Sequence, residues 1–125
     1  MSGRAEEKRR AGGAIRVPFV RRCQLEYAGG ARDSAFIVNI NALGAYVAHD
    51  AIPPLGRPVV FRFQMPGNER EVSVDGIIAW VNPGQEHPVH SLPPGFGIAF
   101  HTLSPEAREK IQQIVADYLA RQSGD

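Results

Sequence analysis

Apolar and polar residues alternate along the chain from residue 17 to residue 27. One parity holds Val17, Phe19, Cys23, Leu25 and Tyr27, and the other holds Arg22, Gln24 and Glu26. Side chains two positions apart in a strand point to the same face of a sheet, so this pattern predicts a half-buried β-strand. An amphipathic helix would instead need apolar residues three and four positions apart.

Four later stretches between glycine and proline turns predict further strands in the same way, at 35–40, 59–65, 70–81 and 96–100, and a short strand is expected at 45–48, after Gly44. The Ala28-Gly29-Gly30 turn joins the first two strands into a hairpin. The predicted inner faces of two strands are Phe36, Val38 and Ile40, and Val72, Val74, Ile78 and Trp80 with Gly76 at the same parity. A glycine at such a position often marks a bulge or a bend.

One helix follows the strands. Ser104 is a suitable N-cap and Pro105 suits the first helical position. The apolar stripe of this helix, about residues 104–122, is Ile111, Ile114, Val115, Tyr118 and Leu119. Several short antiparallel strands followed by one amphipathic helix predict a mainly β fold, a small barrel with a helix packed on it.

The length of 125 residues suits one domain. Cys23 is the single cysteine, so an internal disulfide is excluded and a reducing compartment fits. No apolar run is long enough for a membrane span, and no signal peptide is visible, so we expect a cytoplasmic protein without a membrane partner. Seven of the first 22 residues are basic against Glu6 and Glu7, and we expect residues 1–15 to form a flexible basic arm.

Enzyme chemistry finds little support in the residues. His87 and His90 have a spacing that metal ligands use, but they lie in a proline-rich loop with only Glu86 nearby, so no metal site is expected. The serines lack a nucleophile-elbow context, and Cys23 points inward by parity. We therefore expect neither catalysis nor a cofactor.

The segment from Asn39 to Val47 resembles the second signature of the PilZ domain family, (D/N)-x-S-x-x-G followed by an apolar strand. The later segments 53–56, 61–67, 76–81 and 94–106 are similar to the family's following strands and to the start of its last helix. The resemblance covers roughly residues 16–120. We expect the PilZ domain to span 16–122, with the barrel at about 16–102.

The resemblance implies a six-stranded antiparallel β-barrel with a C-terminal α-helix that binds cyclic-di-GMP. In the family, an R-x-x-x-R motif on the N-terminal arm and the second signature bind this ligand. Arginine's fork suits phosphates and guanine edges because it donates two parallel hydrogen bonds. The candidate binding residues are Arg9, Arg10, Arg16, Asn39, Asn41 and Gly44.

The sequence departs from both motifs. Gly12 stands four residues before Arg16, where the first arginine is expected, and Asn41 replaces the serine. Two hypotheses follow. In the first, the protein is a PilZ adaptor or regulator in cyclic-di-GMP-linked pathways such as motility and surface behaviour, and it works through protein partners without binding the ligand. In the second, it is a cyclic-di-GMP receptor with a displaced arginine motif. A small nucleic-acid-binding barrel is the outside alternative. It is disfavoured because Phe19, Phe61, Phe63 and Trp80 are expected in the core.

Overall fold

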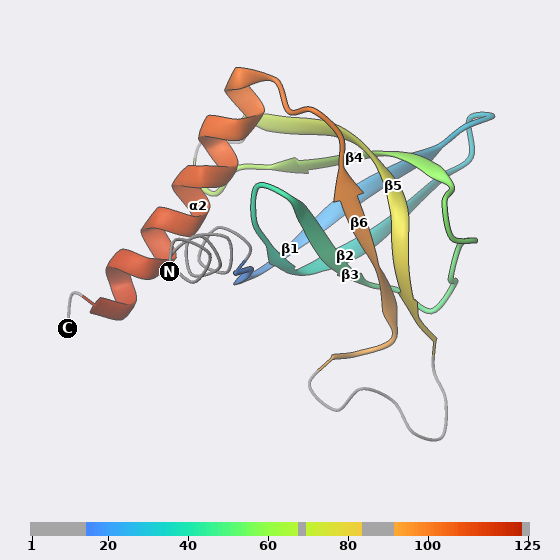
Figure 1. Cartoon of the computed structure of the whole chain (residues 1–125), viewed down its shortest axis with the longest axis horizontal. Coiled ribbons are helices and arrows are strands. Elements are labelled where there is room, and N and C mark those ends of the chain that lie inside the picture. Colours follow the sequence, from blue (N-terminus) through green and yellow to red (C-terminus); the bar gives the residue numbers. More distant parts are fainter. Residues whose placement is uncertain (1–14, 68–69, 84–91, 124–125) are drawn as a thin grey trace, which may run out of the picture.

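Six antiparallel strands close into a barrel, and one helix follows them (Figure 1). The computed structural model describes residues 15–67, 70–83 and 92–123. The elements are β1 (Val17–Tyr27), β2 (Arg32–Ile40), β3 (Gly44–Ala48), β4 (Pro58–Gln64), β5 (Glu71–Asn82), β6 (Gly95–Phe100) and α2 (Pro105–Ser123). Around the barrel the strands follow the order β1-β2-β3-β6-β5-β4. The expected six-stranded antiparallel barrel with a C-terminal helix is confirmed.

The hairpin of β1 and β2 depends on two glycines. Gly29 and Gly30 both have a φ of 96°, a left-handed conformation that glycine adopts without steric cost. The Gly30 N–H donates to the Tyr27 carbonyl at 3.0 Å and closes the turn. The predicted turn at Ala28-Gly29-Gly30 is therefore confirmed.

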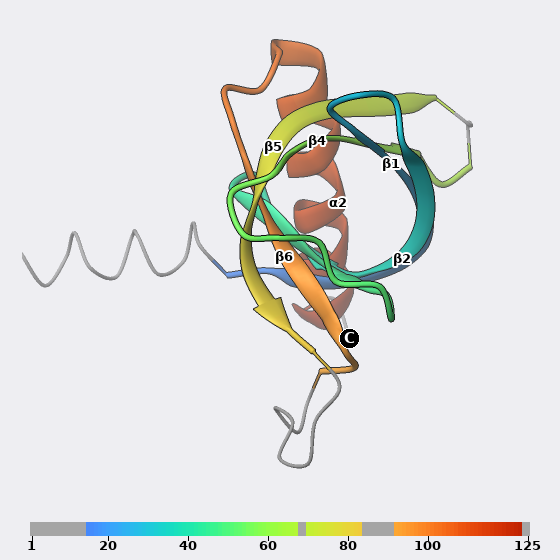
Figure 2. The ribbon, with the colours of Figure 1, turned by 90° about the vertical axis from the view of Figure 1, so that its right-hand side faces the viewer.

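The core fills the barrel and continues under α2. Looking along the barrel, α2 lies across one end (Figure 2). The helix begins where expected, with the Ser104 Oγ accepting a hydrogen bond from the Ala107 N–H at 3.1 Å. Its buried residues are Ala107, Ile111 and Ile114. The predicted stripe continues through Val115 and Tyr118, which are partly buried against the core, but Leu119 at its end is 51% exposed.

The predicted inner face of β2 is wrong in its first half. Phe36 is 48% exposed, whereas Ile37 is fully buried, and Ala35 also faces the core. A β-bulge places Val38 as an extra residue between the Ile37 and Asn39 pairs with β3, so that Ile40 faces the core again. One extra residue reverses the side to which every earlier side chain points.

Trp80 is also not a core residue. The pairing of β5 with β6 shifts between Ile78 and Trp80, so Ala79 is an extra residue and Trp80 turns to the outer face, 43% exposed. The bulge does not fall at Gly76, which instead allows close strand packing: a Cβ there would stand 2.5 Å from the Ala99 carbonyl oxygen. Phe61 and Phe63 are buried as expected. Phe19 is half-buried, edge-on to Phe63 at 5.5 Å.

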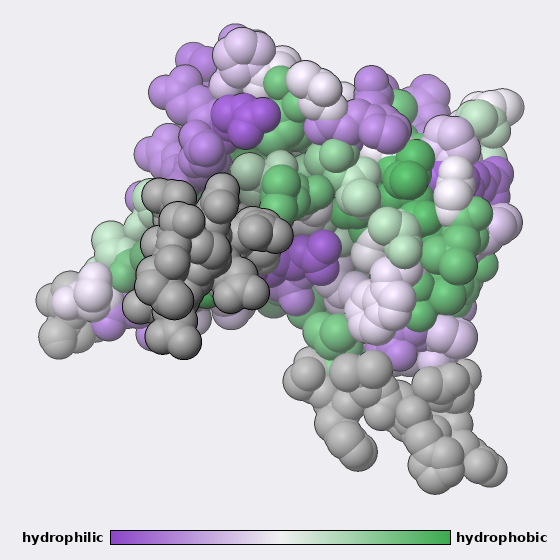
Figure 3. Space-filling view, viewed as in Figure 1, coloured by the Kyte–Doolittle hydropathy of each residue, from purple (hydrophilic) through white to green (hydrophobic). Residues whose placement is uncertain are grey.

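The surface differs between the helix and the barrel wall. On the face shown in Figure 3, the outer side of α2 is hydrophilic, while apolar side chains gather over the wall of the barrel. The one helix in the described part of the chain is too polar to cross a membrane.

Candidate functional site

The turn between β2 and β3 is held by the side chain of Asn41. Its Oδ1 accepts hydrogen bonds from the N–H groups of Leu43, at 2.8 Å, and Gly44, at 3.0 Å. Its own N–H donates to the Gly44 carbonyl at 2.9 Å. Asparagine commonly closes turns in this way, by bonding to backbone groups a few residues ahead. Asn41 is only 2% exposed, and its side-chain oxygen is hydrogen-bonded within the turn.

Gly44 is required at the end of this turn by close contacts. A Cβ at this position would stand 2.4 Å from the Ile98 carbonyl oxygen and 3.1 Å from Nη2 of Arg16. Gly44 is not among the described glycines with positive φ, so clearance and not a left-handed backbone excludes a side chain. The absence of a Cβ lets the Arg16 guanidinium lie against the turn. Partial burial there lowers the pKa of Arg16, which remains a cation at neutral pH.

Asn39 presents an unsatisfied acceptor two residues before Asn41. Its Oδ1 is enclosed, and no hydrogen-bond donor reaches it in the described part of the chain. A buried acceptor without a donor destabilises a protein by about 1–3 kcal/mol. Such an atom is therefore a candidate to receive a hydrogen bond from a bound ligand.

Asn39 belongs to a row of residues that crosses five strands. The register pairs Asn39 with Pro18 of β1 and with Tyr46 of β3. Tyr46 pairs with Gly97 of β6, which in turn pairs with Trp80 of β5. Residues paired in register share a face of the sheet, so Asn39 and the exposed Trp80 lie on the same outer wall. Three strand spacings, roughly 14 Å, separate them.

Trp80 is supported from below by Tyr46 and Gly97. The Trp80 and Tyr46 ring centroids are 5.5 Å apart, and a Cβ on Gly97 would stand 3.6 Å from the Trp80 Cβ. The Tyr46 hydroxyl donates to the Pro93 carbonyl at 2.6 Å and accepts from Nδ2 of Asn82 at 3.1 Å. Burial raises the pKa of Tyr46, and the hydrogen bond from Asn82 offsets part of the rise. The phenol therefore stays neutral and fixes the platform under Trp80.

The structure brings four of the candidate residues into one region of the wall. Arg16, Asn39, Asn41 and Gly44 lie at the β2–β3 turn and the start of β1, although Asn41 faces into the turn. Arg9 and Arg10, and the rest of the expected arm up to residue 14, lie outside the described residues. Trp80 was missed by the sequence analysis because a bulge leaves no mark in the alternation of a strand.

Potential metal ligands do not cluster in the part of the chain that the structure describes. No group of three or more His, Cys, Asp or Glu side chains that could hold a metal ion occurs within residues 15–67, 70–83 and 92–123. His87 and His90 lie outside these ranges. Cys23 is buried, and this burial raises the pKa of its thiol to about 12, so the thiol is protonated and unreactive at neutral pH.

A sequence profile described as the PilZ domain matches residues 4–117. The barrel, the terminal helix and the Asn39–Gly44 turn agree with this match. The chain belongs to the PilZ domain family. No curated protein matches the chain.

Solved structures with the same fold include PilZ domains at low sequence identity. The PilZ domain of CeSA from a cellulose-synthesizing bacterium is 15% identical, with a TM-score of 0.60 over 83% of this chain and 97% of that one. The PilZ domain of YcgR from Escherichia coli, solved with c-di-GMP, is 15% identical, with a TM-score of 0.62 over 86% and 91%. The Borreliella burgdorferi PlzA protein, solved in complex with c-di-GMP, is 16% identical, with a TM-score of 0.58 over 88% of this chain and 44% of that one.

Proposed function

We propose that the chain is a non-enzymatic signalling protein of bacterial cyclic-di-GMP pathways and that it binds cyclic-di-GMP on the outer wall beside the β2–β3 turn. The observation that carries this proposal is the unsatisfied Oδ1 of Asn39, which is in register with the exposed Trp80 and precedes the turn at which the Arg16 guanidinium lies against Gly44. Two of the similar structures, YcgR and PlzA, contain c-di-GMP, which supports the same ligand class.

The chemistry of the ligand matches these groups. Guanine carries an amino donor that an orphaned amide oxygen can accept from, and it offers the O6 and N7 acceptors to an arginine fork. An exposed tryptophan provides a face on which a base stacks for about 1–3 kcal/mol. Asn39, Trp80 and Arg16 thus supply an acceptor, a stacking surface and a cation.

Arg9 and Arg10 are proposed to bring further guanidinium groups to the ligand phosphates from the N-terminal segment. Gly44 is proposed to keep the turn close enough for Arg16 to reach the same ligand. The protein is proposed to act in the cytoplasm, in pathways such as motility and surface behaviour.

Calorimetric titration of the full chain with cyclic-di-GMP at near-physiological salt tests the proposal. We expect Asn39→Ala and Arg16→Ala each to weaken binding by about ten- to a hundredfold, because each removes a hydrogen bond worth about 1.5–3 kcal/mol to a charged or buried group. Arg108→Ala, an exposed change on α2, is the matched control and should bind like the unaltered protein. Equal weakening by all three variants would contradict the assignment of the site.

A ligand-independent adaptor is the second candidate, and one observation favours it. Asn41, which replaces the serine of the family signature, is almost fully buried, and its Oδ1 accepts hydrogen bonds within the turn. Gly12 stands in place of the first arginine. Both differences reduce the number of polar side chains that can contact the ligand. An absence of heat at millimolar ligand, from a folded sample, would reject the receptor and support the adaptor.

The same titration separates a receptor from a nucleic-acid-binding barrel. The exposure of Trp80 removes one argument against nucleic acid. A protein that follows a phosphate backbone loses affinity steeply with added salt. We expect cyclic-di-GMP to bind, and a single-stranded oligonucleotide not to bind, at 200 mM salt, on the order of physiological strength.

A further inference from the structure

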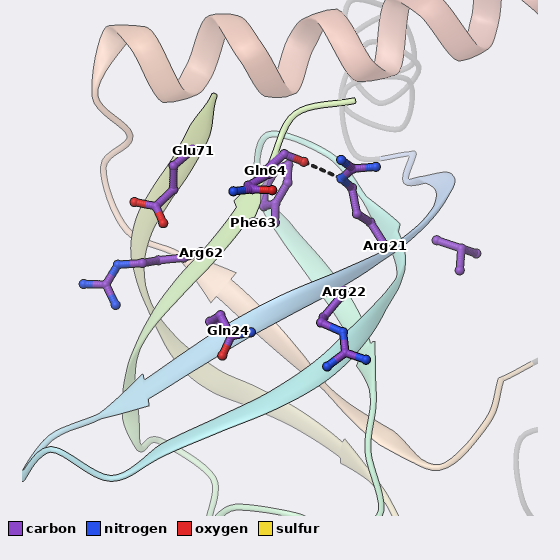
Figure 4. A pocket seen from close by; sticks show the side chains of 8 residues that line it. Arg21, Arg22, Gln24, Arg62, Phe63, Gln64 and Glu71 are labelled. Atoms are coloured by element: carbon purple, nitrogen blue, oxygen red, sulfur yellow. Dashed lines mark hydrogen bonds between the residues drawn. The ribbon is translucent and has the colours of Figure 1, made fainter. Parts of the chain in front are cut away.

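The barrel wall opens between β1 and β4 on the side of α2. The ladder between these strands pairs Gln24–Tyr27 with Val59–Arg62, and in the described chain Val20–Arg22 have no partner in β4. Figure 4 shows the two strands separating beyond Gln24. A groove of about 500 Å³ lies between them. This opening leaves a stretch of each strand without its neighbour.

Arg21 shows that backbone acceptors face this groove. Its Nε donates to the Gln64 carbonyl, and its Nη2 lies 3.4 Å from the Met65 carbonyl oxygen (Figure 4). In a continuous ladder, N–H groups of β1 would serve the end of β4. A side chain does so here, and the facing edge of β1 at Val20–Arg22 is left without a partner in β4.

An exposed apolar side chain lines the same groove. Val20 is 79% exposed there. Phe36, 48% exposed, lies on β2 opposite Arg22, and the Arg22 guanidinium lies over its ring, 5.3 Å from the centroid. A single exposed apolar residue is ordinary, but Val20 lies in a stretch of β1 that has no partner in β4.

The β1 side of the groove is positively charged. Arg21 and Arg22 form no ion pair with a carboxylate in the described part of the chain, whereas Arg62 is balanced by Glu26 at 2.7 Å. Glu71, on the β5 side, is the one carboxylate that lines the groove. A ligand lying along β1 would therefore meet two uncompensated guanidinium groups.

We infer that this groove is a docking site for an extended segment of a partner protein in which acidic and apolar residues alternate. The segment would lie along Val20–Arg22 and add a strand at the opening, a known mode of peptide recognition. Val20 and Arg22 are two positions apart and both exposed, so they share the outer face of β1. The acidic residues of the segment would lie on this face, opposite Arg22, and its apolar residues would point to the other face, toward Phe63, which lines the groove. The inference is independent of the ligand proposed above.

The probe is a capped hexapeptide of alternating glutamate and valine, titrated into the isotope-labelled full chain and followed by NMR. We expect the amide signals of Val20–Arg22 and Gln64 to shift. Arg22→Glu and Val20→Asp should each weaken binding at least tenfold, because both place a negative charge at an exposed position on the face that would meet the peptide carboxylates. Arg108→Glu on α2 is the charge-matched control and should leave the affinity unchanged.

The lysine counterpart of the peptide tests charge selectivity and should bind at least tenfold more weakly. The inference is overturned if the glutamate peptide gives no shifts at millimolar concentration, if both peptides bind equally, or if the shifts lie elsewhere. Self-association of the chain that Arg22→Glu abolishes, without peptide binding, would also overturn it and assign the face to a second copy.

Discussion

Gly44 shows how a single missing Cβ determines the geometry of the candidate site. We expect Gly44→Ala to lower the free energy of unfolding by about 1–3 kcal/mol, because the new methyl group would meet the Ile98 carbonyl oxygen at 2.4 Å. Gly97→Ala is the matched control on the same wall, since its nearest contact would be 3.6 Å. Urea unfolding measures both, and an equal loss in the two variants would contradict the steric explanation.

The buried thiol of Cys23 makes a testable contribution to the pH dependence of stability. Burial raises the pKa of this thiol to about 12 in the folded protein, whereas an unfolded cysteine titrates near about 8.5. The unfolded chain therefore releases this proton first, and the stabilisation by the neutral thiol is lost as pH rises through this window. We expect the unfolding free energy of the unaltered protein to fall more steeply between about pH 9 and pH 11 than that of Cys23→Ala, by up to about 1.4 kcal/mol per pH unit.

At the scale of elements, the bulge in β5 is open to a direct test because Trp80 is the only tryptophan. A buried tryptophan, as the alternation predicted, would be shielded from an added quencher. Because the Trp80 side chain is 43% exposed, we expect acrylamide to quench its fluorescence in the folded protein. Quenching that appears only in denaturant would show that the ring is buried and that the bulge is absent.

The helix divides into a part that stabilises the barrel and a part that does not. Ile111 is fully buried and Leu119 is 51% exposed, although both belong to the stripe seen in the sequence. We expect Ile111→Ala to cost about 2–5 kcal/mol of unfolding free energy, and Leu119→Ala less than about 0.5 kcal/mol. A large loss of unfolding free energy in Leu119→Ala would show that the Leu119 side chain is buried in solution, contrary to the structure.

For the whole molecule, the ligand site and the groove lie on different parts of the wall, so their variants should act separately. We expect Asn39→Ala to reduce cyclic-di-GMP binding and leave the glutamate peptide unaffected, and Arg22→Glu to do the reverse. Parallel titrations of both variants with both ligands measure this. Loss of both activities in either variant would show that the two sites are coupled or that the variant is misfolded.

Local sequence signals predicted the strands, the helix and the family. Alternation predicted the strands, Gly29 and Gly30 predicted the hairpin turn, and Ser104 with Pro105 predicted the start of the helix. These signals are local, because a turn, a cap or a strand face depends on residues a few positions apart. The candidate residues came from two local motifs: Arg16 from the arginine motif of the N-terminal arm, and Asn39 and Gly44 from the second signature.

Strand pairing in the folded barrel places Phe36 and Trp80 on the outer wall and sets where β1 leaves β4. The register of two paired strands cannot be read from either strand alone. One extra residue in a ladder reverses the faces of the strand, and nothing in the strand itself records it. The row from Asn39 to Trp80 and the groove beside Arg21 therefore exist only in the closed barrel, where register brings distant residues to one surface.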